Sequence, residues 1–173
     1  MAVLPIRLFG DPVLRSRARE VTEVDDAVRD LIKSMEETMR AAAGVGLAAP
    51  QVGVQRRVIV WEYEEDRGAL ANPVIVAQRG EVEGEEACLS VPGLVYPVVR
   101  SEWVRVEGVE PSGRTVAVEA WDWTARILQH EIDHLNGVLF VDRLPPNLRR
   151  EAMAKLREQA LDGAVSAESG STL

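Results

Sequence analysis

The sequence has a single cysteine, Cys88, and only two histidines among its 173 residues. One thiol cannot close an intramolecular disulfide, and a lone free cysteine fits a reducing compartment. A cysteine of this kind is most often a small buried apolar residue. Cys88 becomes a candidate ligand only if other residues point to a metal site.

The sequence also lacks long apolar runs and an excess of basic residues. No apolar stretch approaches the roughly 20 residues that a membrane-spanning helix needs. The first residues contain no basic segment followed by an apolar stretch, so we expect no secretory signal and a cytoplasmic location. Asp and Glu number 28 against 20 Lys and Arg, which gives a net charge of −8. This balance argues against general DNA binding and against binding to anionic membranes.

The length predicts one domain with a core large enough to fold without disulfides. We assign this domain to residues 1–162 and expect the small, polar residues 163–173 to form a disordered tail. At the other end, residues 2–22 contain turn signals around Gly10 and Pro12 and are expected to lie across the surface.

Between these ends the sequence alternates between helical and strand-like patterns. Apolar residues recur at helical spacing over residues 25–43, which predicts an amphipathic helix ended by Gly44. Further helices are predicted over residues 123–136, before Gly137, and over residues 146–161. Segments rich in Val, Ile and Trp predict strands at residues 57–63, 69–78, 81–86, 103–109 and 115–121. This order indicates an α+β fold, with short antiparallel strands around a central helix and further helices at the two ends.

The central predicted helix contains His130, Glu131 and His134. Positions i and i+4 lie on one helical face, so both imidazoles can bind one ion. A divalent ion lowers the pKa of its bound water toward about 7, and a neighbouring glutamate can take the remaining proton. This is the HExxH pattern of metal hydrolases. The alternative is a pair of surface histidines on a charged helix, which the apolar residues of the same helix disfavour.

Two histidines leave such an ion without a third protein ligand. No further histidine follows His134, and Asp142, which comes after a predicted turn, stays open as a ligand. Cys88 is the better candidate, because a thiolate binds zinc or ferrous iron strongly. One cysteine and two histidines also leave a fourth position open for water, as in catalytic sites. The predicted site therefore combines Cys88 and the two histidines as ligands with Glu131 as general acid and base.

Three segments together resemble the peptide deformylase family. The loop at residues 44–51 resembles its first motif, Gly-x-Gly-hydrophobic-Ala-Ala-x-Gln, and here reads Gly-Val-Gly-Leu-Ala-Ala-Pro-Gln. Residues 86–90, which read Glu-Ala-Cys-Leu-Ser, resemble the second motif, and residues 130–134 resemble the third. Order and spacing agree with the family over residues 3–161. One position departs from the pattern, because the family has Gly before the cysteine and this chain has Ala87.

The resemblance implies a metal-dependent hydrolase that removes the N-formyl group from the formylmethionine of nascent polypeptides and releases formate. It implies ferrous iron as the ion in the cell, with zinc or nickel able to substitute. Cys88 and the two histidines would ligate the ion, and Glu131 would pass a proton from the attacking water to the leaving amine. Gln51 and the backbone N–H of Leu89 would stabilise the oxyanion of the intermediate.

The first motif would also hold the substrate. By itself a loop of this kind is more often just an ordinary turn that ends a helix. With the family in view, the Gly46 backbone is expected to pair with the substrate main chain as an added strand would. The methionine side chain then needs an apolar pocket, which we expect among Val45, Trp123 and Ile127.

Two charged residues and the last helix have more than one interpretation. Asp133 can orient a histidine or pair with a cation, and Arg100 can anchor Glu86 or the substrate backbone. Basic residues of the last helix either form a solvated surface or dock on ribosomal RNA, as basic C-terminal helices do in bacterial relatives. These residues are Arg149, Arg150, Lys155 and Arg157.

Two rival functions remain open from the residues alone. One is an HExxH endopeptidase with a different third ligand, and the other is a non-catalytic module that holds a structural zinc. A structural zinc site usually has four protein ligands, and the sequence offers three. The endopeptidase lacks a downstream histidine and leaves the loop that ends in Gln51 unexplained.

Overall fold

The computed structural model describes residues 2–169, with side chains up to residue 163. Its α-helices are α1 (Asp26–Ala41), α2 (Asp122–Leu135) and α3 (Pro146–Ser169). Its short 3₁₀ helices are η1 (Pro12–Arg15), η2 (Ala49–Val52) and η3 (Phe140–Arg143). None of the helices in this part of the chain is long and apolar enough to cross a membrane.

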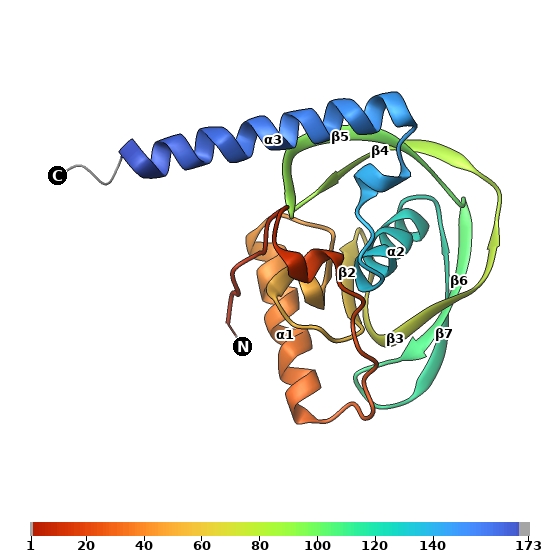
Figure 1. Ribbon diagram of the computed structural model, residues 1–173. Helices are drawn as coiled ribbons and strands as arrows, with labels where there is room; N and C mark the ends of the chain where they lie inside the picture. Colours follow the sequence, from red (N-terminus) through yellow and green to blue (C-terminus); the bar gives the residue numbers. More distant parts are fainter. Residues whose placement is uncertain (1, 170–173) are drawn as a thin grey trace.

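The strands form two separate antiparallel sheets. The larger sheet has the order β1-β2-β3-β6-β7. Its strands are β1 (Gly46–Ala48), β2 (Val58–Tyr63), β3 (Asp66–Arg79), β6 (Trp103–Val109) and β7 (Thr115–Trp121). The other two strands, β4 (Val82–Cys88) and β5 (Val91–Arg100), pair only with each other. Helix α2 lies at the centre, enclosed by strands, and α1 lies to one side (Figure 1). The predicted α+β arrangement is confirmed.

Strand β2 explains why the larger sheet is covered on both faces. Successive side chains of a strand point to opposite faces. Val58 and Val60 belong to the apolar cluster with α1, whereas Ile59 and Trp61 belong to the cluster with α2. A strand buried on both faces needs an apolar residue at every position, and each such residue contributes about 1.5–3 kcal/mol of burial free energy.

Helix α1 begins with an Asp cap and ends earlier than predicted. The Asp25 side chain accepts a hydrogen bond of 2.9 Å from the N–H of Val28. The helix ends at Ala41, and the residue in the left-handed conformation is Ala43, with φ 54°, rather than Gly44. Gly44 serves a different purpose, because a Cβ there would lie 2.8 Å from Leu89 Cδ1. The glycine therefore allows close approach of the loop to the turn after β4.

The sequence found most elements and missed two strands. All five predicted strands exist, and the bounds of β6 and β7 match the prediction. Strand β1 and the ten residues of β5 were missed, and β5 contains Pro92, Gly93 and Pro97, which are residue types depleted in strands. A strand of a two-stranded sheet has a free edge, where proline is tolerated. Helix α3 was predicted to end at residue 161 but continues to Ser169. Residues 163–169 of the expected disordered tail therefore belong to this helix. Residues 170–173 lie outside the described residues.

Candidate metal centre

Helix α2 supplies the two histidines on one face. The Nε2 atoms of His130 and His134 lie 3.3 Å apart, and the ring centroids are separated by 5.0 Å. Every residue of α2 from Thr124 to Leu135 is buried, so both rings lie inside the protein. The alternative of two surface histidines is therefore wrong.

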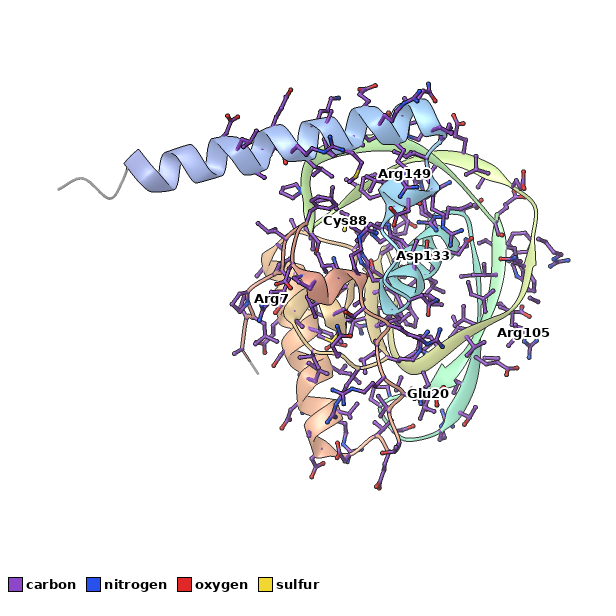
Figure 2. The ribbon with its side chains drawn as sticks, viewed as in Figure 1. Arg7, Glu20, Cys88, Arg105, Asp133 and Arg149 are labelled. Atoms are coloured by element: carbon purple, nitrogen blue, oxygen red, sulfur yellow. The ribbon has the colours of Figure 1, made fainter. Side chains whose placement is uncertain are left out.

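Strand β4 brings the third predicted ligand to the same place. Cys88 is its last residue, and Cys88 Sγ lies 3.3 Å from His134 Nε2. The candidate ligand atoms of Cys88 and the two histidines all lie within 4.8 Å of one another, and Figure 2 shows Cys88 inside the molecule beside α2. Asp142, the ligand that the sequence left open, is not part of this group. Its carboxylate accepts hydrogen bonds from Arg15 and from the N–H of Leu139.

The donor set fits a bound divalent ion. Glu86 Oε2 lies 2.8 Å from His130 Nδ1, so the Nδ1–H donates to the carboxylate and Nε2 is left facing the other two ligands. A carboxylate on the far nitrogen is the usual partner of a metal-binding histidine. One sulfur and two imidazole nitrogens suit zinc, iron, nickel or cobalt. Three protein ligands leave a position for water or substrate, which is typical of a catalytic site.

The charges around this cluster favour a cation. Burial opposes a charge on His130, but the facing Cys88 and Glu86 outweigh it and raise the pKa of His130 well above its ordinary value. Burial, and then the neighbouring His130, lower the pKa of His134 well below its ordinary value. Burial also opposes ionisation of Glu86, yet hydrogen bonds from His130 and Arg100 hold its pKa far below the usual range. Surroundings that draw a proton onto an imidazole attract a metal cation in the same way.

Glu131 lies beside the cluster without a protein partner for one of its oxygens. Its Oε2 atom is buried and has no hydrogen bond among the described residues. Its Oε1 atom faces Gly46, where a Cβ would lie only 2.5 Å away. Burial raises the pKa of Glu131 to about 7, although the nearby His130 acts in the opposite direction. A carboxyl group with such a pKa can take up and return a proton near neutral pH.

A cavity of about 490 Å³ opens onto this cluster. Val45, Trp123 and Ile127, the predicted side-chain pocket, all line it, and Ile127 is the most buried of the three. Gly46 lines the same cavity and begins β1, an edge strand that pairs with β2 on one side only. The residues that the sequence assigned to substrate binding therefore surround one space next to the histidines.

The two predicted oxyanion donors, Gln51 and Leu89, both lie near the cysteine and line the cavity. Gln51 belongs to η2, and its Oε1 accepts a hydrogen bond of 2.9 Å from the N–H of Ala48. Its Nε2 donates to Ser90 Oγ at 3.1 Å and lies 3.7 Å from Cys88 Sγ. Leu89 directly follows the cysteine, in the turn between β4 and β5, and lines the cavity.

Residues 2–22 connect the three motif segments, which the sequence did not reveal. The N–H of Arg7 donates to the carbonyl of Gln51, and the N–H of Phe9 donates to the carbonyl of Ser90, both at 2.7 Å. The N–H of Ala18 donates to the carbonyl of Leu135, at the end of α2, at 2.9 Å. Backbone hydrogen bonds of this kind leave no residue pattern, so sequence reasoning could not find them.

The sequence matches the family model of polypeptide deformylase over residues 3–150. The chain belongs to this family. As a deformylase it is a metal-dependent hydrolase that removes the N-formyl group from the formylmethionine of nascent polypeptides and releases formate. The similarity to known deformylases favours this activity over an endopeptidase or a structural zinc module.

Named deformylases match nearly the whole chain. The peptide deformylase of Acidothermus cellulolyticus is 51% identical over 158 residues, which cover 91% of this chain and 88% of the relative. A crystal structure of a peptide deformylase from Legionella pneumophila has a TM-score of 0.87 at 42% identity, covering 94% of this chain and 98% of that chain. The crystal structure of the Thermus thermophilus peptide deformylase also has a TM-score of 0.87, at 46% identity, covering 92% of this chain and 96% of that chain.

The contacts around the site decide between the interpretations that the sequence left open for Arg100 and Asp133. Arg100 anchors Glu86 through two hydrogen bonds of 2.8 and 3.0 Å, and it also donates to Asp133 at 2.6 Å. Asp133 pairs with this arginine and with Arg143, so its partners are cations rather than a histidine. Glu86, not Asp133, orients His130. The sequence could have indicated this role, because Glu86 lies two residues before Cys88 and the two side chains therefore point to one face of β4.

Ala87 fits the deformylase site without backbone strain. It is absent from the described residues with positive φ, which besides glycines are Ala43, Glu64, Asn72 and Asp122. Its side chain is exposed at the cavity wall. The methyl group that replaces the usual glycine therefore costs no conformational energy at this position.

Proposed function

We propose that this deformylase holds its ion through Cys88, His130 and His134 and uses Glu131 as general acid and base. The support for this assignment is the buried ligand cluster beside a carboxylate oxygen that has no protein partner among the described residues. When bound, the ion would polarise the formyl carbonyl and acidify the attacking water. We propose ferrous iron as the ion in the cell, with zinc or nickel able to use the same ligands.

The substrate peptide is proposed to lie along the free edge of β1. Gly46 would exchange main-chain hydrogen bonds with it, because an edge strand offers unpaired backbone groups. Val45, Trp123 and Ile127 would receive the methionine side chain in the cavity that they line. Burial of that side chain would hold the formyl group against the ligand cluster.

The chain's own residues then move one proton and stabilise one charge. Glu131 takes a proton from the water whose oxygen adds to the formyl carbon. Gln51 Nε2 and the N–H of Leu89 donate to the formyl oxygen as it becomes negative, a contribution of a few kcal/mol for such donors. When the C–N bond breaks, Glu131 delivers its proton to the leaving amine, and formate and a free N-terminus result.

Release of formate from formyl-Met-Ala-Ser tests this function. Protein loaded with iron or nickel under anaerobic conditions should release formate, and Glu131→Ala should not. Casein serves as the control substrate and should stay uncleaved. A loaded wild type that releases no formate would contradict the proposal, and casein cleavage would support the endopeptidase instead. Metal analysis of protein purified without oxygen tests the identity of the ion.

Docking of α3 on the ribosome is a further proposal. Arg149 pairs with Asp142 and Lys155 with Glu151, whereas Arg150 and Arg157 are exposed and have no ion pair among the described residues.

These two exposed cations can contact phosphates of ribosomal RNA. We also propose a cytoplasmic location, where nascent chains are made. Arg150→Glu with Arg157→Glu should weaken co-sedimentation with ribosomes at low salt. Unchanged co-sedimentation would contradict docking.

A further inference from the structure

The proposed ligands come from two parts of the protein that share no sheet and no apolar cluster. Cys88 belongs to the β4–β5 hairpin, whose strands pair only with each other. The hairpin packs its apolar side chains with η3 and α3, in a cluster that contains Val91, Phe140 and Leu156 but no residue of α2. The apolar residues of α2 pack with the larger sheet, in a cluster that contains no hairpin residue. The distance from Cys88 to the histidines therefore depends on other contacts.

Besides the backbone hydrogen bonds of residues 2–22, such contacts come from three polar side chains on one face of α2, at positions i, i+3 and i+7. We call Arg126, Gln129 and Asp133 the linking row. Gln129 binds the residue that follows β5, with hydrogen bonds of 2.9 Å to both the N–H and the carbonyl of Ser101. Asp133 accepts from Arg100, the last residue of β5. The linking row therefore fixes one end of the hairpin through two of its members.

Arg126 binds both strands of the hairpin. It donates to the carbonyl of Val82 on β4 and to the carbonyl of Val98 on β5, each at 2.8 Å. The nitrogen that reaches Val98 also donates to Glu86 Oε1 at 2.9 Å, and Glu86 is the carboxylate that orients His130. One guanidinium thus contacts the strand that ends in Cys88 and the partner of one histidine. Its planar fork is suited to several acceptors at once.

The surroundings of Arg126 are shaped to hold it. A Cβ on Gly84 would lie 3.0 Å from the guanidinium carbon, so glycine at this place on β4 makes room for the group. The guanidinium lies over the ring of Trp123, with the ring centroid 5.6 Å from the guanidinium carbon. The residue is 4% exposed. A buried cation of this kind is expensive unless its hydrogen bonds are made, so its geometry is strongly constrained.

We propose that Arg126 is a positioning residue of the metal site, which sets the distance between the cysteine and the two histidines. It does so by fixing both strands of the hairpin, and the carboxylate behind His130, to helix α2. This role rests on the proposed ligand set. Without Arg126 the hairpin keeps its own ladder, its apolar packing and its contacts with Gln129 and Asp133. Strand β4 loses the hydrogen bonds from Arg126, so Cys88 is held less firmly relative to α2.

Metal affinity is the direct test of this role. Arg126→Met keeps the length and the apolar stem but removes every donor. Its dissociation constant for Zn²⁺, measured by competition with a chelator, should rise about 10–100-fold, the usual effect of losing a group that supports metal ligands. Arg126→Lys keeps one charge and should show a smaller increase. Arg105→Met, an exposed arginine on β6, is the matched control and should bind like the wild type.

Cobalt provides a readout that a purely structural role would not change. A cysteine ligand gives Co²⁺ a sulfur-to-metal charge-transfer absorption, which should weaken in Arg126→Met relative to the wild type. Hydrogen exchange of the β4 and β5 amides should also accelerate, while the amides of β2 stay protected.

Gly84→Ala tests the same contact without removing the arginine. Its Cβ presses on the guanidinium and should weaken zinc binding in the same direction, by less than Arg126→Met. This variant decides the matter alone if Arg126→Met does not fold. Wild-type affinity and an unchanged cobalt spectrum in the folded variants would overturn the role of Arg126, even if their melting temperatures fell. A wild type that binds no metal would instead contradict the proposed ligand set.

Discussion

Helices α2 and α3 both carry charged residues, but most of those on α2 are buried and those on α3 are exposed. Helix α2 is buried from Thr124 to Leu135, and strands enclose it (Figure 1). Helix α3 lies along one side of the molecule and extends beyond it (Figure 1). Its basic residues are exposed. A carboxylate of α2 such as Asp133 is paired with two arginines, whereas Glu151 of α3 shares a half-exposed pair with Lys155.

The difference shows why counting charges does not identify the important ones. Loss of one partner of a buried pair leaves the other charge without solvent or counter-charge, which is strongly destabilising. An exposed pair loses little, because water and salt replace the partner. The buried charged residues of α2 should therefore be sensitive to substitution, and the exposed ones of α3 should tolerate it.

The largest contrast is expected for two glutamates. Glu131→Gln keeps the shape of the side chain but cannot take up a proton, so kcat/KM for formyl-Met-Ala-Ser should fall about 10²–10⁴-fold. Metal content should stay at the wild-type level. Glu158→Gln, an exposed position on α3, should leave the rate unchanged. Comparable rates for the two variants would remove Glu131 from the mechanism.

A contrast in stability is expected for Arg100, which pairs with Glu86 and with Asp133 of α2. Arg100→Leu deprives Glu86 and Asp133 of their shared partner and should lower the free energy of unfolding by about 3–5 kcal/mol. The exposed Arg105→Leu should change it by no more than about 0.5 kcal/mol. Urea denaturation of the metal-free proteins measures both values. Equal changes in the free energy of unfolding would mean that burial does not determine how much a charged residue contributes to the stability of this protein.

The smallest effect is expected on α3. Lys155→Gln removes the pair with Glu151, in which both side chains are about half exposed. The midpoint of urea denaturation and the rate of formate release should both stay unchanged, and raising the salt concentration should reveal no difference from the wild type. A clear loss of stability would show that α3 depends on its surface pairs.

Local patterns explain how much of the site was predictable. His130 and His134 lie four residues apart on a helix, so their common face follows from helix geometry alone. Strands β6 and β7 were predicted at their observed bounds, because alternating Val residues describe a half-buried strand. Strand β5 was missed because its prolines are tolerated only at a free edge, and a free edge is a property of the sheet rather than of the strand.

The sequence by itself determined the ligand types, the spacing of the two histidines and the family to which the chain belongs. Only the tertiary structure decided that Cys88 meets those histidines, that Glu86 supports His130 and that Arg126 ties the hairpin to α2. The physical reason is the separation along the sequence over which each interaction acts. Helix and strand periodicity act between residues a few positions apart, whereas a buried charge is tolerated only where distant segments supply its partners.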